Sequence, residues 1–338
     1  PLPCPAARLR VKAPDGICSN NRQPSRYSLK LRQKCPFRIA PDGNYAIQMG
    51  VIFSWTRPPI NIAAHTDQAL AVPMQPRARG ALRISSKTYG SASVIGDLYQ
   101  QGCVKALFPR AAAGGLTGVF LNTSGGMTGG DELSITATAG AGSRLTLTSQ
   151  AAERVYLAQP GPMAQMTTRL DAKAGARVDW LPQETILFNG SALRRKLEVD
   201  LTGDACFFGV EPLVFGRVSM GETLRDARFA DNITIRRDGH PIFADAVRLS
   251  GDIHAQLAGT ATARGNCAMA SVIYAAPDAE ALLAPLRALL PASAGASLIR
   301  DGVLYARLLA PDSYILRQSL VPIIARLHGA APPKTWML

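Results

Sequence analysis

Hydrophobic and polar residues alternate with a period of two along most of the chain. Residues 133–137 and 145–147 alternate on either side of a Gly-Ala-Gly turn at 140–142, and this pattern predicts two strands joined as a β-hairpin. Residues 197–201 form another alternating strand, which ends at a Thr-Gly-Asp turn at 202–204. Because a period of two is typical of strands with one buried face, the sequence indicates a mainly β fold.

Two Asp-Gly dipeptides predict further hairpins. One is at 238–239, shortly after the strand-like residues 233–235, and the other is at 301–302 within the segment 299–304. Asp-Gly adopts the backbone angles that tight two-residue hairpin turns require. Residues 178 and 180 are predicted to lie on one face of a further strand.

Helical periodicity appears near the end of the chain. Asp278 is placed to cap a helix whose leucines between residues 282 and 290 share one face. A second helix is predicted from Ser313 to His328, with Asp312 as its cap. The apolar faces of these helices either pack on the domain's own sheet or offer a partner a docking surface. The prolines expected to kink or split the two helices are Pro285 and Pro322.

The predicted architecture is a mainly β, many-stranded sheet or sandwich-like domain with about two C-terminal α-helices and no internal sequence repeat. This domain is assigned to residues 76–338. Residues 1–75 form a leader rich in proline and arginine, which we expect to be largely irregular and disordered. The leader is an extension specific to this protein, a misplaced gene start or an arginine-rich targeting segment.

The net charge of +13 lies mainly in the leader. Residues 1–80 carry twelve Lys or Arg against three Asp. In the domain, we interpret the basic runs 194–196 and 236–237 as solvated strand faces, because strand-like and acidic residues flank them. A nucleic-acid interface would interleave aromatic residues with a basic stripe, so we expect no nucleic-acid partner for the domain. No apolar run reaches the roughly 20 residues that cross a bilayer, so no membrane partner is expected.

The six cysteines include no Cys-x-x-Cys pair, and a chain of this length with so few thiols is not a disulfide scaffold. We therefore expect a reducing, cytoplasmic location. The cysteines of the domain are interpreted as small buried hydrophobic residues. They are Cys103, Cys206 and Cys267.

A glycine-rich run, LNTSGGMTGGD, occupies residues 121–131 between two strand-like stretches. Its glycines permit positive φ and close backbone approach, so the run predicts a sharply folded structural loop. A Walker loop ends in Gly-Lys-Ser/Thr, whereas this run ends in Gly-Gly-Asp, and no nucleotide site follows from it. The four glycines are Gly125, Gly126, Gly129 and Gly130.

The glycine-rich run and four later blocks resemble the urease accessory protein UreD (UreH) family, in the same order along the chain. We place the resemblance over roughly residues 76–338. The first block extends the glycine run to LNTSGGMTGGDELSI. The later blocks are LTSQAAERVY (147–156), DWLPQETILF (179–188), RKLEVDL (195–201) and GVEPLVFGRVSMGET (209–223).

This resemblance implies a many-stranded β fold with two helices near the C-terminus, and a role as a scaffold in nickel delivery. Proteins similar to this one bind UreF, which recruits the GTPase UreG, and act on the urease apoprotein. The implied protein is a urease maturation factor and not an enzyme. It has no permanently bound cofactor, although Ni²⁺ passes transiently, and the apolar faces of its C-terminal helices are candidate docking surfaces for UreF.

Five acidic residues within or after the family blocks are the candidates for nickel passage or partner contact. A path that must release Ni²⁺ favours sparse carboxylates and water over the imidazoles and thiolates of a tight site, and no tight metal site is predicted. Each acid is alternatively a turn cap or the partner of an arginine. The five are Asp131, Glu184, Glu211, Glu222 and Asp245.

Two other functions compete with this interpretation. A carboxylate-pair hydrolase would place two acids about 5–9.5 Å apart in a groove with aromatic platforms, yet aromatic residues form 6% of the chain. A basic nucleic-acid-binding protein would depend on the leader. The sequence contains neither a Gly-x-Ser-x-Gly elbow nor a His-Glu-x-x-His zinc motif, so no catalytic residue is assigned.

Overall fold

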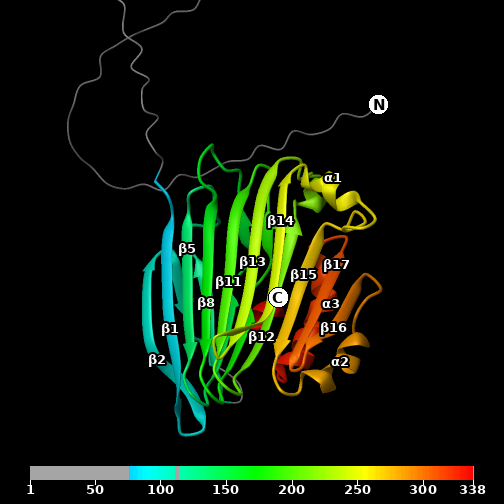
Figure 1. The fold of residues 1–338 in the computed structure, drawn as a ribbon. Coiled ribbons are helices and arrows are strands. Elements are labelled where there is room, and N and C mark those ends of the chain that lie inside the picture. Colours follow the sequence, from blue (N-terminus) through cyan, green and yellow to red (C-terminus); the bar gives the residue numbers. More distant parts are fainter. Residues whose placement is uncertain (1–75, 111–113, 338) are drawn as a thin grey trace, which may run out of the picture. The chain divides into compact units, whose positions relative to one another are not determined.

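The computed structural model describes residues 76–110 and 114–337. The predicted leader, residues 1–75, lies outside the described residues. In the described part, most of the chain forms strands of two sheets, and α-helices are concentrated towards the C-terminus (Figure 1). The predicted mainly β fold with C-terminal helices is confirmed.

Sheet A has seven strands in the order β14-β13-β11-β8-β5-β1-β2. The five strands from β13 to β1 in this order run parallel, and an antiparallel strand closes each end. The strands are β1 (Arg79–Tyr89), β2 (Ala92–Gly102), β5 (Glu132–Ala139), β8 (Ala164–Ala172), β11 (Ala192–Leu201), β13 (Ala227–Arg237) and β14 (His240–Gly251).

Sheet B has ten strands, eight of which follow the order β16-β17-β15-β12-β9-β6-β4-β3. The two short strands β7 and β10 pair with each other, and β10 also pairs with β12. The strands are β3 (Val104–Leu107), β4 (Leu116–Asn122), β6 (Arg144–Ser149), β7 (Glu153–Val155), β9 (Arg177–Leu181), β10 (Thr185–Leu187), β12 (Cys206–Phe215), β15 (Ala268–Ala275), β16 (Ala294–Arg300) and β17 (Val303–Ala310).

The chain alternates between the two sheets and so winds as a solenoid. Strands β5, β8 and β11 belong to sheet A, and β6, β9 and β12, each of which follows one of them, belong to sheet B. The predicted hairpin across residues 140–142 is therefore wrong. This turn is a corner of the solenoid, because its amides bond to neighbouring coils: Gly140 N–H donates to Ser86 O, and Gly142 N–H donates to Ala174 O. The coils repeat although the sequence does not.

The two hairpins predicted from Asp-Gly are confirmed. Strands β13 and β14 pair antiparallel around Asp238 and Gly239, and β16 and β17 pair antiparallel around residues 301–302. Asp238 and Gly239 have φ of 49° and 78°. A two-residue turn with positive φ at both positions matches the twist of the adjoining strands.

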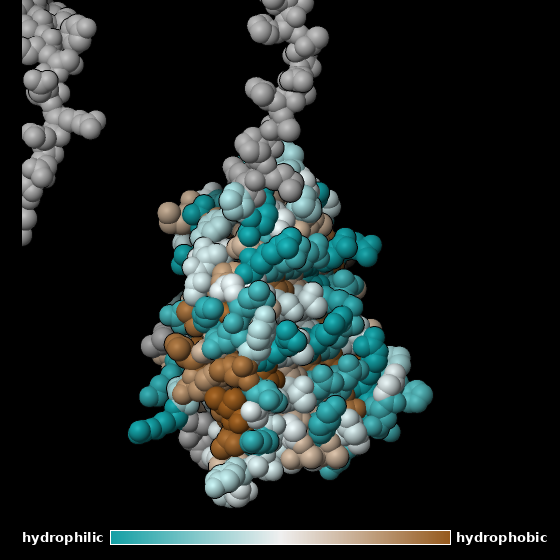
Figure 2. Space-filling model, turned by 90° about the vertical axis from the view of Figure 1, so that its left-hand side faces the viewer, coloured by the Kyte–Doolittle hydropathy of each residue, from teal (hydrophilic) through white to brown (hydrophobic). Residues whose placement is uncertain are grey.

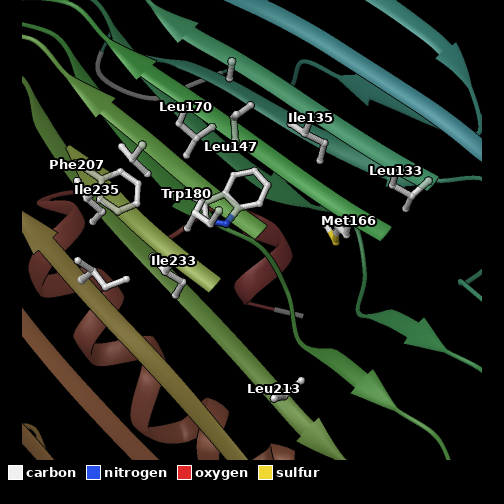
Figure 3. Close-up of a cluster of buried hydrophobic side chains, with 14 of the residues drawn as sticks. Leu133, Ile135, Leu147, Met166, Leu170, Trp180, Phe207, Leu213, Ile233 and Ile235 are labelled. Atoms are coloured by element: carbon white, nitrogen blue, oxygen red, sulfur yellow. The ribbon is translucent and has the colours of Figure 1, made fainter. Parts of the chain in front are cut away.

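The main hydrophobic core lies between the two sheets (Figure 3). Inward residues alternate along each strand, and the rings of Trp180 and Phe120 stack with centroids 5.2 Å apart. This core holds both sheets together because each sheet contributes one apolar face. The three domain cysteines are half-buried, and Cys103 and Cys206 pack against the two cores, so the prediction that they are buried hydrophobic residues is correct only in part.

The α-helices are α1 (Ile253–Ala258), α2 (Ala279–Arg287) and α3 (Ser313–His328), and the described residues also form two 3-10 helices, η1 (Val218–Met220) and η2 (Lys334–Trp336). Both predicted helices are present, and α3 has the predicted bounds. Asp312 caps α3 by accepting a hydrogen bond from Ile315 N (2.9 Å), whereas Asp278 accepts one from the Tyr274 hydroxyl. Neither proline splits its helix, since α2 and α3 continue past Pro285 and Pro322. The pattern missed the short helix α1.

The third layer is formed by α2 and α3, which cover the outer face of sheet B. The apolar face of α3 is buried in a second core there, so it packs on the domain's own sheet. In the part of the chain that the structure describes, no helix is long and apolar enough to cross a membrane. The face near β2, at the edge of sheet A, is largely hydrophilic with one compact hydrophobic area (Figure 2).

Candidate functional site

A buried ion cluster lies between the two sheets, with Arg195 of β11 at its centre. The Arg195 guanidinium donates to both carboxylate oxygens of Asp231 on the adjacent strand β13, at 2.5 and 3.1 Å. Its Nη1 lies 2.7 Å from Oε2 of Glu211, which reaches inward from sheet B. The cluster therefore joins the two sheets. Trp180 Nε1 donates to Glu211 Oε1 at 2.6 Å, and Thr185 Oγ1 accepts from Arg195 Nη1 at 3.1 Å.

Strand alternation places Arg195 inside. Residues 193, 195, 197, 199 and 201 of β11 face the core, whereas Arg194 and Lys196 are exposed. Our interpretation of 194–196 as a solvated face is therefore wrong for Arg195, which is 6% exposed. Asp231 occupies an equivalent inward position of β13 and is the register partner of Arg195. A charged residue at an inward position of an alternating strand was the missed sequence signal.

The cluster contains two carboxylates and one guanidinium in a buried setting. Burial raises the pKa of Glu211, and the nearby Asp231 raises it further, against the opposing effects of Arg195 and Trp180. For Arg195, burial acts to lower the pKa, but Asp231 and Glu211 outweigh it and keep the guanidinium charged. Partners on several sides are what allow charges to remain in a core.

A cavity of about 210 Å³ adjoins the cluster. It extends from the glycine-rich loop to the segment after β9, and Trp180 lines it. Burial raises the pKa of Glu153 to about 7, and Asn122 Nδ2 opposes this rise by donating to its carboxylate at 3.1 Å. The polar residues that line the cavity and carry oxygen atoms include Asn122, Ser149, Glu153, Gln183, Thr185 and Glu211.

Asp131 closes the glycine-rich loop instead of lining the cavity. Its buried carboxylate accepts hydrogen bonds from the backbone amides of Ala78 (2.8 Å) and Thr128 (2.7 Å). Close approach explains the glycine at position 126, where a Cβ would lie 2.3 Å from a ring carbon of Tyr156. Of the four glycines predicted to shape this loop, three have positive φ, namely Gly125, Gly126 and Gly130.

Three further predicted acids each pair with an arginine. Glu184 pairs with an arginine of α3, and Glu222 pairs with an arginine five residues before it. Asp245 of β14 pairs with an arginine of β17 and so joins these two strands. Of the five predicted acids, Glu211 lines the cavity, and the structure does not bring the five together. The passage or partner role of all five stays a prediction. The pairs are Glu184–Arg317 (3.2 Å), Glu222–Arg217 (2.9 Å) and Asp245–Arg307 (2.5 Å).

Within residues 76–110 and 114–337, no group of three or more His, Cys, Asp or Glu side chains is arranged to hold a metal ion. The cavity instead offers separated oxygen donors. Sequence reasoning missed Glu153, which lies within a family block but was not among the acids selected there. Its position beside Asn122 and the glycine-rich loop depends on how β4 and β7 are placed in the solenoid.

Comparison with known proteins assigns the family. The model of the UreD urease accessory protein family matches residues 78–337. A urease accessory protein UreD of Ruegeria pomeroyi is 51% identical over 257 residues, which cover 76% of this chain and 100% of the relative. The UreD proteins of Roseobacter denitrificans and Rhizobium leguminosarum bv. viciae are 47% and 43% identical, and each match covers 78% of this chain and 96% of the relative. The chain therefore belongs to the UreD family of urease accessory proteins.

Proposed function

We propose that this protein is a cytoplasmic urease maturation chaperone, which joins UreF and UreG to the urease apoprotein and assists nickel incorporation. Membership of the UreD family supports this role. The protein acts as a scaffold and carries out no chemical step itself. GTP hydrolysis belongs to UreG in this proposal, because the glycine-rich run lacks the Lys-Ser/Thr ending of a phosphate-binding loop.

The cavity is the part of the domain through which Ni²⁺ would pass. The supporting observation is an interior space of about 210 Å³ lined by separated oxygen atoms, including the carboxylates of Glu211 and Glu153. Sparse oxygen ligands bind Ni²⁺ more weakly than several imidazoles or thiolates would, which suits an ion that must be released. With a pKa of about 7, Glu153 exchanges a proton for the ion near neutral pH.

The buried cluster favours this role over a carboxylate-pair hydrolase. Glu211 and Asp231 both bind Arg195 and are nearly inaccessible to solvent, whereas a glycosidase pair flanks a substrate groove. The nucleic-acid alternative rests on the leader, outside the described residues.

The test is urease activation with Glu211→Gln and Glu153→Gln, separately and together. Each change removes a negative charge and nearly preserves the side-chain shape. The matched control is Glu198→Gln, because Glu198 does not line the cavity and pairs with Lys196 (2.7 Å) and Arg169 (3.1 Å) on the outer face of sheet A. Urease is co-expressed with UreF, UreG and each variant, and its activity and nickel content are measured.

We expect both readouts to fall at least tenfold in the double variant and to stay near the wild-type values in the control. Co-purification with UreF must be unchanged, so that the loss is not one of assembly. Full activation by the assembled double variant would refute nickel passage through this cavity.

A further inference from the structure

Sheet B is interrupted beside the cavity. Strand β9 ends at Leu181 and β10 begins at Thr185, while the neighbouring strands β6 and β7 are separated by residues 150–152. On β12, Gly209 pairs with β9 and Leu213 pairs with β10, so Glu211 lies within the same interruption. The cavity lining includes residues 149–154 and 182–183. The interior space therefore reaches the break in the sheet.

The outer side of this break is covered by α3 and by the segment that follows it. Arg317 Nη1 of α3 donates to Gln183 Oε1 at 2.7 Å and lies 3.2 Å from Glu184 Oε1. Arg317 Nη2 donates to the carbonyl of Thr335 at 2.8 Å. Gln183 thus lines the cavity and also accepts a hydrogen bond from the covering residue Arg317.

Residues 331–337, here called the strap, are anchored at two points. The Thr335 hydroxyl is 3.0 Å from that of Thr148 on β6. Trp336 is 1% exposed, and its Nε1 donates to Leu181 O at 2.9 Å, at the end of β9. Before these anchors the chain runs without a helix or strand from Gly329 to Pro333. Trp336 belongs to the second core, but the strap pairs with no strand of either sheet, so it can detach without breaking a β ladder.

We propose that the cavity opens to solvent through the break in sheet B, and that Arg317 and the strap close this mouth to divalent cations. The identity of the cation rests on the proposed function. In the closed state the guanidinium repels a cation and occupies the oxygens of Gln183 and Glu184. When Arg317 and the strap move away, these two side chains present free oxygen atoms at the mouth, which hard cations bind. Glu184, one of the acids selected from the sequence, is then the outermost cation ligand.

Trp180 offers a direct readout of this closure, because it lines the cavity and is 1% exposed. The chain contains two other tryptophans, Trp55 and Trp336. In the full-length double variant Trp55→Phe, Trp336→Phe, the fluorescence comes from Trp180 and the strap keeps an aromatic anchor. Replacing the anchor with Trp336→Ala instead releases the strap without adding a fluorophore.

Quenching by acrylamide and by Ni²⁺ is measured on the purified chain. We expect both Stern–Volmer constants to rise at least threefold with Trp336→Ala, relative to Trp336→Phe. Arg317→Ala in the Trp336→Phe background should produce the same rise. The matched control is Arg169→Ala, which removes an exposed arginine from an ion pair on sheet A and should leave quenching unchanged.

Circular dichroism shows whether each variant keeps its β structure. If Trp336→Ala unfolds the chain, Arg317→Gln, which keeps a polar side chain and removes the charge, provides the same readout. Unchanged quenching in folded variants at Trp336 and Arg317 would refute the proposal that Arg317 and the strap close the cavity. Urease activation separates the two proposals. If quenching is unchanged and the Trp336 and Arg317 variants activate urease normally, only the proposed closure by the strap is refuted. If quenching increases but activation does not depend on Glu153 or Glu211, only the proposed nickel passage is refuted.

Discussion

Replacing Arg195 with methionine should be among the most destabilising single changes in the domain. Methionine fills a similar volume but leaves Glu211 and Asp231 facing each other without the guanidinium that both bind. Removing one partner from a buried ion cluster typically costs about 3–5 kcal/mol. Because a folded domain is stable by only about 5–15 kcal/mol, this change removes a large part of the free energy of unfolding.

The loss should depend on pH. Burial already raises the pKa of Glu211, and removing Arg195 raises it further. A carboxyl group whose folded-state pKa lies above its unfolded value contributes stability below the unfolded value and loses that contribution as pH rises through the folded value. Arg195→Met should therefore be less destabilising at pH 5 than at pH 8.

Urea unfolding followed by circular dichroism measures these differences. The comparison is the triple variant Arg195→Met, Asp231→Leu, Glu211→Gln, in which no buried charge of the cluster remains and the new amide oxygen at position 211 can still accept from Trp180. It should recover most of the stability that the single variant loses, because the uncompensated charges dominate the cost. A triple variant no more stable than Arg195→Met would refute this reasoning and assign the loss to packing or hydrogen bonding.

Three further changes test other parts of the structure. The free energy of unfolding of Glu153→Gln, relative to that of the wild type, should rise by up to about 3 kcal/mol between pH 5 and pH 8. Burial raises the pKa of Glu153 from 4.5 to about 7, so its ionisation in this range weakens the folded wild type. A difference between the urea midpoints of variant and wild type that is the same at both pH values would contradict this. Asp131→Ala should cost about 2–4 kcal/mol and speed proteolysis of the glycine-rich loop, because the amides of Ala78 and Thr128 lose their acceptor; an unchanged midpoint and cleavage rate would show that the carboxylate does not hold the loop. Asp312→Ala should cost about 1 kcal/mol in thermal or urea unfolding through the lost α3 cap, with Asp312→Asn close to wild type.

Local sequence pattern was sufficient for elements that depend on neighbouring residues. The Asp-Gly turns at 238–239 and 301–302 specify hairpins, because φ is positive at both Asp238 and Gly239 in the first turn and at Gly302 in the second. Helix α3 was predictable to its end residues, since its apolar periodicity and its Asp312 cap lie within one segment. The β period and the family blocks likewise identified the fold class and the family.

Only the tertiary structure decided how distant segments combine. The pattern around 140–142 predicts a hairpin, yet the turn is a corner, because its amides find their partners in other coils of the solenoid. Alternation along β11 places Arg195 inside, but Asp231 and Glu211 become its partners only through the order of strands in the two sheets. The break in sheet B and the strap that covers it join residues more than 130 positions apart. Such contacts depend on the packing of complete layers, about which a local pattern of polar and apolar residues carries no information.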